Sequence, residues 1–290
     1  MSSNSLAGKR VLITGGARGI GAALAKRLHD RGATVAVAGL EPHLLAQVAA
    51  ELGGPWRQVD VSVREQVDQM MHELVTELGG LDVVVANAGI AKQLPIDGGD
   101  PQIMEKTLAV NTLGVYYTLR AAAPHISHPG GYALMTSSLA AAVQVPLLGA
   151  YSASKAAVET IGNTLRLEIR PTGARVGVAY FAEIDTDMTS RGFGTQAAKA
   201  LTGGGTVSGV APLSSAINAL ERGIARRSRR IVAPAWVAPL LPIRMIVQRA
   251  VELRGFPDLP RALQIARDEH VRFTTDQPGA ELDDAGRRAG

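Results

Sequence analysis

Short apolar runs alternate with longer stretches of helical periodicity, and this alternation constrains the fold more than any other feature of the chain. The apolar runs are continuous, which indicates strands that are buried on both faces of a parallel sheet. A further strand is predicted at Arg230 to Ala233. The six main predicted strands run from Arg10 to Thr14, Thr34 to Ala38, Trp56 to Val59, Leu81 to Ala86, Gly131 to Thr136 and Arg175 to Tyr180.

A helical stretch follows each predicted strand, so the order along the chain is β-α-β-α. This order is typical of an α/β fold with a doubly wound parallel sheet of the Rossmann type. The predicted helices run from Gly19 to Arg31, Pro42 to Leu52, Arg64 to Leu78, Met104 to Ser127, Ala150 to Arg170 and Ala211 to Arg226.

One domain accounts for most of the chain. With 290 residues, of which 46% are apolar, the chain can bury one large core. We expect a nucleotide-binding domain over residues 1–255 and a C-terminal extension over residues 256–290 that is partly flexible. Residues 274–290 are polar and contain glycine, so we expect them to pack little against the rest.

Composition argues against several classes of function. The chain has no cysteine, which excludes disulfides and thiolate metal sites, so we expect no metal centre and a cytoplasmic location. The first ten residues lack the apolar run of a signal peptide. The formal charge of +4 comes largely from four arginines within residues 226–230, and few aromatic side chains accompany them, which does not favour nucleic-acid binding.

The segment over residues 231–251 is apolar enough to resemble a membrane span. Pro234, Pro239 and Pro242 interrupt it, as do Arg244 and Arg249, so we do not expect it to cross a bilayer. It could cover a substrate, form a subunit contact or touch a membrane surface as an interfacial segment. The sequence leaves these three roles open.

A glycine-rich turn follows the first predicted strand and opens the first predicted helix. From Thr14 to Gly21 it reads Thr-Gly-Gly-Ala-Arg-Gly-Ile-Gly. Glycines allow the backbone to approach a pyrophosphate closely, and the start of the helix presents free N–H groups and a positive dipole end to it. The turn therefore indicates a nucleotide site, although an ordinary packing turn is the alternative.

The spacing of this turn, G-x-x-x-G-x-G, resembles the signature of the short-chain dehydrogenase/reductase family. The resemblance continues in family order over most of residues 9–190, and it implies an NAD(P)-dependent oxidoreductase that interconverts an alcohol and a ketone. The motifs that carry it are Asp60-Val61, Asn87-Ala88-Gly89, Asn111, Ser138 and Tyr151-x-x-x-Lys155. The coenzyme-binding residues that it implies are Gly15, Arg18, Gly19, Ile20, Gly21, Asp60, Val61, Asn87, Ala88, Gly89, Tyr151, Lys155, Ile184 and Thr186.

Tyr151 and Lys155 lie on the same face of a predicted helix, where the ammonium would favour the phenolate. We therefore expect the pKa of Tyr151 to fall from about 10 toward neutrality. The resemblance implies that Tyr151 exchanges a proton with the substrate oxygen, while Lys155 holds the nicotinamide ribose. It further implies that Ser138, rather than its neighbour Ser137, binds the reacting oxygen, and that Asn111 holds a water that relays protons. Taken singly, each of these residues could equally be structural.

The end of the second predicted strand bears on the choice of coenzyme, because an acidic residue there binds the ribose 2′-hydroxyl and repels a 2′-phosphate. Gly39 occupies the position expected for that acid, and Leu40 replaces the arginine typical of NADP enzymes. Arg18 could pair with a phosphate, whereas Glu41 would oppose one if it points inward. On this balance we expect NADP rather than NAD.

The region beyond the sixth predicted strand is expected to determine the substrate. Residues 185–210 are predicted to form a mobile lid, and Ala182-Glu183 stands where the family usually has Pro-Gly. Glu183 either contacts the substrate or faces water. An apolar cluster before Tyr151 favours a lipophilic alcohol or ketone, or else packs against the lid or a second subunit; its members are Leu139, Val143, Val145, Pro146, Leu147 and Leu148.

The residues define one enzyme hypothesis, one rival from another class and, as a third option, a protein that acts at a membrane surface. The leading hypothesis is a short-chain alcohol dehydrogenase or carbonyl reductase that acts on small molecules as a homodimer or homotetramer. The rival is a catalytically silent NAD(P)-binding regulatory or scaffold protein. The presence of Ser138, Tyr151, Lys155 and Asn111 disfavours this silent protein, because a site without catalytic activity has no chemical reason to keep all four residues.

Overall fold

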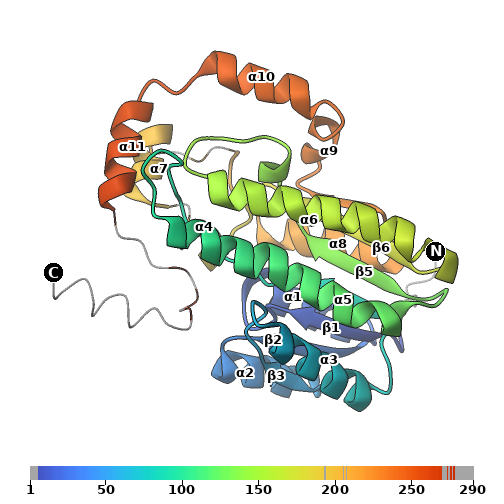
Figure 1. Cartoon of the computed structure of the whole chain (residues 1–290). Coiled ribbons are helices and arrows are strands. Elements are labelled where there is room, and N and C mark those ends of the chain that lie inside the picture. The colour runs from blue at the N-terminus through green and yellow to red at the C-terminus, as the bar shows by residue number, and fades with distance from the viewer. Residues whose placement is uncertain are drawn as a thin grey trace.

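The computed structural model describes residues 6–192, 194–204, 206, 208–269, 273, 275 and 277, and its core is a seven-stranded parallel sheet. The strand order is β3-β2-β1-β4-β5-β6-β7, which confirms the predicted doubly wound fold (Figure 1). The strands are β1 (Arg10–Thr14), β2 (Thr34–Gly39), β3 (Trp56–Gln58), β4 (Val83–Ala86), β5 (Tyr132–Thr136), β6 (Arg175–Phe181) and β7 (Arg230–Ala233).

Helices cover both faces of the sheet, which explains the continuous apolar strands. Successive strand residues point to opposite faces, so Leu12 packs in one layer of the core and Ile13 in the other. One face is covered by α1 (Gly19–Asp30), α2 (Pro42–Leu52) and α8 (Leu213–Arg226). The other is covered by α3 (Arg64–Leu78), α5 (Gly114–Ile126) and α6 (Gly149–Glu168).

The predicted helix from Met104 to Ser127 is divided in the structure. It begins earlier, as α4 (Pro101–Leu108), because the side chain of Asp100 accepts a hydrogen bond from the Gln102 N–H at 3.0 Å. A π-helical turn, η1 (Ala109–Leu113), then separates α4 from α5. Such turns are rare and occur frequently at functional sites. This one carries Asn111, which is fully buried.

Most of the remaining described elements lie in the predicted lid and after β7. The predicted lid contains η4 (Met188–Gly192) and α7 (Gln196–Thr202), and α7 packs on α11 (Leu259–Asp268) through a small core that includes Ala197, Leu201 and Ala262. Between β7 and α11 lie α9 (Val237–Leu240) and α10 (Arg244–Arg254). Two short 3-10 turns complete the described elements, η2 (Leu139–Ala141) and η3 (Arg170–Thr172).

Most of residues 274–290 lies outside the described residues, as do Phe193, Gly205 and Val207 within the lid. Thr275 and Gln277 are described, and Gln277 is only 8% exposed. The expectation that this stretch packs little otherwise lies outside the described residues. Within the part of the chain that is described, no helix is both long and apolar enough to span a bilayer.

Candidate active site

A cavity of about 520 Å³ opens where the carboxyl ends of β1, β4, β5 and β6 meet. In open α/β sheets, ligands bind at this edge, outside the point where the strand order reverses. The cavity brings together fourteen of the residues expected from the sequence: Gly15, Arg18, Gly19, Ile20, Asp60, Val61, Asn87, Ala88, Gly89, Ser138, Tyr151, Lys155, Ile184 and Thr186. Gly21 and Asn111 lie behind its wall, since neither contributes to the lining.

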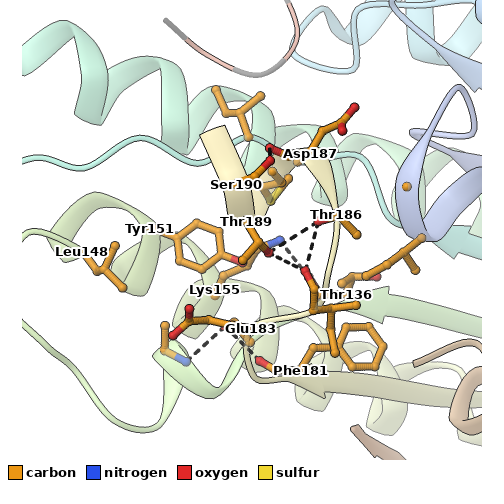
Figure 2. Close-up of a pocket in the computed structure, with 18 of the residues that line it drawn as sticks. Thr136, Leu148, Tyr151, Lys155, Phe181, Glu183, Thr186, Asp187, Thr189 and Ser190 are labelled. Atoms are coloured by element: carbon orange, nitrogen blue, oxygen red, sulfur yellow. Dashed lines mark hydrogen bonds between the residues drawn. The ribbon is translucent and has the colours of Figure 1, made fainter. Parts of the chain in front are cut away.

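Tyr151 lies in the first turn of α6 and points into the cavity, but its surroundings differ from those expected (Figure 2). Burial raises the pKa of the Tyr151 phenol to about 12, although a hydrogen bond with the Ser138 side chain acts in the opposite direction. The expected fall of the Tyr151 pKa toward neutrality is therefore wrong for this structure, because loss of solvation outweighs the hydrogen bond with Ser138. The phenol is protonated throughout the neutral range.

Lys155 lies one helical turn beyond Tyr151, on the same face of α6, as predicted. Its Nζ is 5.6 Å from the centre of the Tyr151 ring and donates a hydrogen bond to the backbone oxygen of Thr136 at 2.9 Å. Burial lowers the pKa of the Lys155 ammonium to about 8. The lysine is therefore neither a solvated surface charge nor fixed in one protonation state near neutral pH.

The two neighbouring serines after β5 have different partners. The Ser137 hydroxyl donates to the backbone oxygen of Lys155 at 2.8 Å and so anchors α6 to the end of β5. The Ser138 hydroxyl donates to the backbone oxygen of Phe181 at 3.2 Å, accepts from the Ala140 N–H at 3.1 Å, and contacts the Tyr151 phenol. This contact pairs Ser138 with Tyr151.

Asn111 connects the π-helical turn to the rest of the site without reaching the cavity. Its amide forms two hydrogen bonds with the backbone of Ile90, at 2.8 and 2.9 Å, and donates to the Ser154 hydroxyl at 3.0 Å. The Ser154 hydroxyl in turn donates to the backbone oxygen of Tyr151 at 2.7 Å. The Asn111 side chain therefore ties the segment after β4 to the first turn of α6.

The glycine turn packs too closely against its surroundings to accept a side chain at Gly15 or Gly21. Gly15 has a φ of +67°, and a Cβ atom there would lie 2.8 Å from the Ala88 Cα; at Gly21 it would lie 2.1 Å from the Gly15 oxygen. The Asn87 amide donates to the Thr14 oxygen at 3.2 Å and so holds the turn against β4. Helix α1 begins at this turn with no side-chain cap among the described residues, so its N-terminus is suited to bind a pyrophosphate.

Three charged side chains meet at the rim of the cavity near the end of β2. Arg18 forms a two-pronged ion pair with Glu41, in which the distance from Nε to Oε2 is 2.9 Å, and its Nη1 lies 3.2 Å from Asp187 in the lid. Glu41 also lines the cavity, so its carboxylate would repel a phosphate bound there. Arg18 is therefore already held by two carboxylates.

The opposite end of the cavity is mostly apolar. Of the cluster expected to bind substrate, five side chains line it: Leu139, Val143, Val145, Pro146 and Leu148. Leu147, with a φ of +69°, instead packs into the small core between α7 and α11. Glu183 lines the cavity too, but its carboxylate accepts hydrogen bonds from the Ser208 N–H and hydroxyl at 3.0 and 3.1 Å. Glu183 thus binds the lid to the end of β6.

Two residues of the C-terminal stretch complete the cavity wall and were not expected from the sequence. The Thr275 hydroxyl lies 3.4 Å from the Glu41 carboxylate, and the Gln277 amide nitrogen donates to the Thr275 oxygen at 2.9 Å. Both line the cavity, and the Gln277 Oε1 is buried with no hydrogen-bond partner among the described residues. A polar tail carries no periodic signal, so only the fold could place these residues.

Comparison with known proteins agrees with this geometry. The family model described as short chain dehydrogenase matches residues 9–197. An oxidoreductase of Sarocladium schorii is 34% identical over 197 residues, which cover 67% of this chain and 79% of the relative. A hydroxynaphthalene reductase of Aspergillus fumigatus is 33% identical over 63% of this chain and 69% of its own length.

Solved structures share the fold. A dehydrogenase/reductase from Sinorhizobium meliloti superimposes with a TM-score of 0.69 at 28% identity, over 79% of this chain and 96% of that one. A short chain dehydrogenase/reductase from Burkholderia phymatum, solved in complex with NAD, gives a TM-score of 0.73 at 22% identity, over 87% of this chain and 97% of that one.

Proposed function

Because the chain belongs to the short-chain dehydrogenase family of oxidoreductases, we propose that it interconverts a secondary alcohol and a ketone with a nicotinamide coenzyme. The observation that carries this proposal is the meeting of Ser138, Tyr151 and Lys155 in one cavity, which the glycine turn at the start of α1 also lines. When bound, the nicotinamide supplies or accepts the hydride. The protein supplies the proton and the positions of the reactants.

Tyr151 is proposed as the general acid in the direction of ketone reduction. Its raised pKa keeps the phenol protonated at neutral pH, so it can donate to an oxygen on which negative charge develops. The hydroxyl of Ser138 lies beside the phenol and would bind the same oxygen. Lys155 places a positive charge under this pair below its pKa of about 8, which would stabilise the phenolate left after donation.

Asn111 is proposed as a positioning residue. Its amide fixes both Ile90 and Ser154, and Ser154 bonds the backbone of Tyr151. The role of Asn111 in holding a water for proton relay stays a prediction. The remaining residues that would hold the coenzyme are the glycine turn with the start of α1, Asp60 and Val61, Asn87 to Gly89, and Ile184 with Thr186.

The coenzyme is proposed to be NAD(H), which revises the expectation of NADP. Arg18 was the one feature that favoured a phosphate, and it is paired with Glu41 and Asp187. A ribose hydroxyl could donate to the Glu41 carboxylate, whereas a 2′-phosphate would be repelled by it.

The substrate is proposed to be a lipophilic alcohol or ketone. Val143, Val145, Pro146 and Leu148 form an apolar wall near Tyr151, and apolar walls with few polar groups are typical of sites for such ligands. The name of one relative, hydroxynaphthalene reductase, agrees with a substrate of this kind.

A panel of aliphatic, alicyclic and aromatic ketones and secondary alcohols, each assayed with NAD(H) and NADP(H), tests the proposal. We expect a change in the reduced-nicotinamide absorbance with lipophilic members of the panel and faster turnover with NAD(H). Tight coenzyme binding without turnover of any member would overturn the proposal and support the silent NAD(P)-binding scaffold. Failure to bind either coenzyme would overturn both.

A further inference from the structure

Helix α10 presents an apolar face to solvent. Met245, Ile246 and Leu253 are 79%, 70% and 71% exposed, and no residue of this helix, which is described in full, is buried. Ile246, Arg249 and Leu253 follow one another at helical spacing, so they lie on one side together with Met245. We call these four residues the α10 face.

The rest of the molecule holds α10 by its other side. Val247, Gln248 and Val251 are half-buried, and the Gln248 side chain accepts a hydrogen bond from the Gln144 N–H at 2.8 Å. At the start of the helix, Arg244 pairs with Glu159 of α6 at 3.0 Å. Figure 1 shows α10 at the periphery, beyond α6 and far from the sheet. The α10 face is therefore displayed outward by a helix with a fixed orientation.

Positive charge accompanies the apolar side chains. The helix contains three arginines and one glutamate, which leaves it a net charge of +2; within the α10 face, Arg249 is 68% exposed and pairs with Glu252 at 3.2 Å. A second copy of the chain meeting this face about a two-fold axis would bring two helices of net positive charge together. A bilayer with anionic headgroups would instead receive the aliphatic side chains among its acyl chains and the guanidinium groups among its phosphates.

We propose that the α10 face docks the protein on the surface of an anionic membrane, with the helix parallel to the bilayer plane. This orientation has a consequence that rests on the proposed function. Gln144, which bonds α10, lies between Val143 and Val145, and both valines line the apolar end of the cavity. The substrate end of the site would therefore face the membrane, where a lipophilic alcohol or ketone is concentrated.

Cosedimentation of the full chain with vesicles tests the docking without any assay of activity. We expect binding to phosphatidylcholine vesicles that contain phosphatidylglycerol, and weak binding to pure phosphatidylcholine. Ile246→Asp and Leu253→Asp should each lower the partition coefficient at least tenfold, and Arg249→Gln should lower it about fivefold. Leu167→Asp is the matched control, because Leu167 is also 71% exposed but lies on α6, and it should leave binding unchanged.

Light scattering of the same variants separates the alternatives. Absence of vesicle binding by the wild-type chain would overturn the proposal. If, in addition, the wild-type chain formed an oligomer that Ile246→Asp dissociates, the α10 face would be a subunit contact instead. Equal loss of vesicle binding in Leu167→Asp would overturn the assignment to α10. None of these outcomes depends on whether the site reduces ketones.

Discussion

The carboxylate of Glu41 holds the guanidinium of Arg18 at the coenzyme end of the cavity, with Oε2 of Glu41 2.9 Å from Nε of Arg18. The pair joins the N-cap of α2 to the N-cap of α1, and Asp187 extends it to the lid at 3.2 Å. Arg18 is the only arginine among the described residues that line the cavity, and Glu41 and Asp187 already bind its guanidinium. A phosphate bound here would therefore lie beside two carboxylates. Glu41 is therefore the residue through which coenzyme selectivity can be tested.

Replacing Glu41 by glutamine keeps the shape of the side chain and removes its charge. We expect Glu41→Gln to tighten NADPH binding about tenfold, which corresponds to about 1.4 kcal/mol, because Arg18 is released to pair with the 2′-phosphate. NADH binding should weaken or stay unchanged. Fluorescence titration with both reduced coenzymes measures the effect. Glu65→Gln, at an exposed position of α3, is the control. Equal changes for both coenzymes would contradict the assignment.

Removing the phenol of Tyr151 tests the proton chemistry directly. We expect Tyr151→Phe to lower kcat for ketone reduction by about 10²–10⁴-fold, the range found for loss of a general acid. Coenzyme affinity should change little, because the ring remains in place, and fluorescence titration checks this. Tyr116→Phe, at a position 46% exposed, should retain full activity. A Tyr151→Phe enzyme with wild-type kcat would show that the proton comes from elsewhere.

The pH dependence of reduction should follow Lys155 rather than Tyr151. Tyr151 stays protonated up to a pH of about 12, whereas Lys155 loses its charge near pH 8, so the lysine is the first of the two to change as pH rises. We expect kcat at saturating coenzyme to be constant well below pH 8 and to fall above it, as the charge that stabilises the phenolate disappears. In Lys155→Met the rate should be low and flat. A falling limb near pH 8 that persists in this variant would exclude Lys155 as its origin.

The parts of this site that the sequence predicts are those determined by short stretches of chain. The buried strands follow from continuous apolar runs, and Tyr151 and Lys155 share a face because four residues make about one helical turn. The glycine turn is also determined by a short stretch of chain. Gly15 has a positive φ where β1 ends and α1 begins, and glycine adopts such a φ without strain.

The parts that the sequence misses depend on distant contacts. The π-helical turn at Asn111 is selected by hydrogen bonds to Ile90 and Ser154, 21 and 43 residues away. Leu147 resembles its apolar neighbours but packs with Ala197 and Leu201 of the lid. Sequence spacing places only Lys155 beside Tyr151 and so predicts a lowered pKa, whereas burial by the whole fold raises the pKa of Tyr151.

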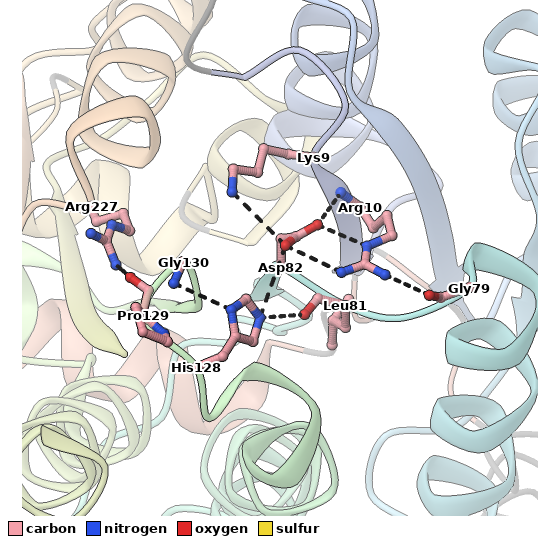
Figure 3. A network of polar contacts seen from close by, with 9 residues as sticks. All are labelled: Lys9, Arg10, Gly79, Leu81, Asp82, His128, Pro129, Gly130 and Arg227. Carbon is pink, nitrogen blue, oxygen red and sulfur yellow. Dashed lines mark hydrogen bonds and ion pairs between the residues drawn. The ribbon is translucent and has the colours of Figure 1, made fainter. Parts of the chain in front are cut away.

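Asp82 lies at the amino ends of β1 and β4, whereas the cavity lies at their carboxyl ends (Figure 3). Its Oδ2 accepts hydrogen bonds from the Arg10 N–H at 3.0 Å and from Arg10 Nε at 2.9 Å, and Lys9 lies 3.9 Å from Oδ1. Burial acts to raise the pKa of the Asp82 carboxyl, but the hydrogen bonds from Arg10 outweigh it and lower the pKa below its usual value.

Asp82→Asn should therefore destabilise the protein by about 1–3 kcal/mol at neutral pH, as expected for the loss of charge-assisted hydrogen bonds. A lowered carboxyl pKa stabilises the fold above the unfolded pKa of about 3.9, and this contribution disappears as pH falls through the lower folded value. Urea unfolding curves should show a large difference from wild type at pH 7 and a smaller one in strong acid. Asp97→Asn, whose side chain is 87% exposed, should have little effect. A difference that did not shrink in acid would contradict this account.

Gln277 provides the sharpest test of the C-terminal stretch. Its side chain is held by a hydrogen bond to the Thr275 oxygen at 2.9 Å, and its buried Oε1 lines the cavity without a partner among the described residues. Such an oxygen is costly to bury unless a ligand donates to it. Because Thr275 contacts Glu41, the donor should belong to the adenosine half of the coenzyme. We expect Gln277→Ala to weaken binding of both NADH and ADP-ribose by about twofold to tenfold, equivalent to one hydrogen bond of roughly 0.5–1.5 kcal/mol. Gln69→Ala, on the exposed side of α3, should bind both as wild type does. If calorimetry found unchanged affinities in Gln277→Ala, the stretch would cover the cavity without binding the coenzyme.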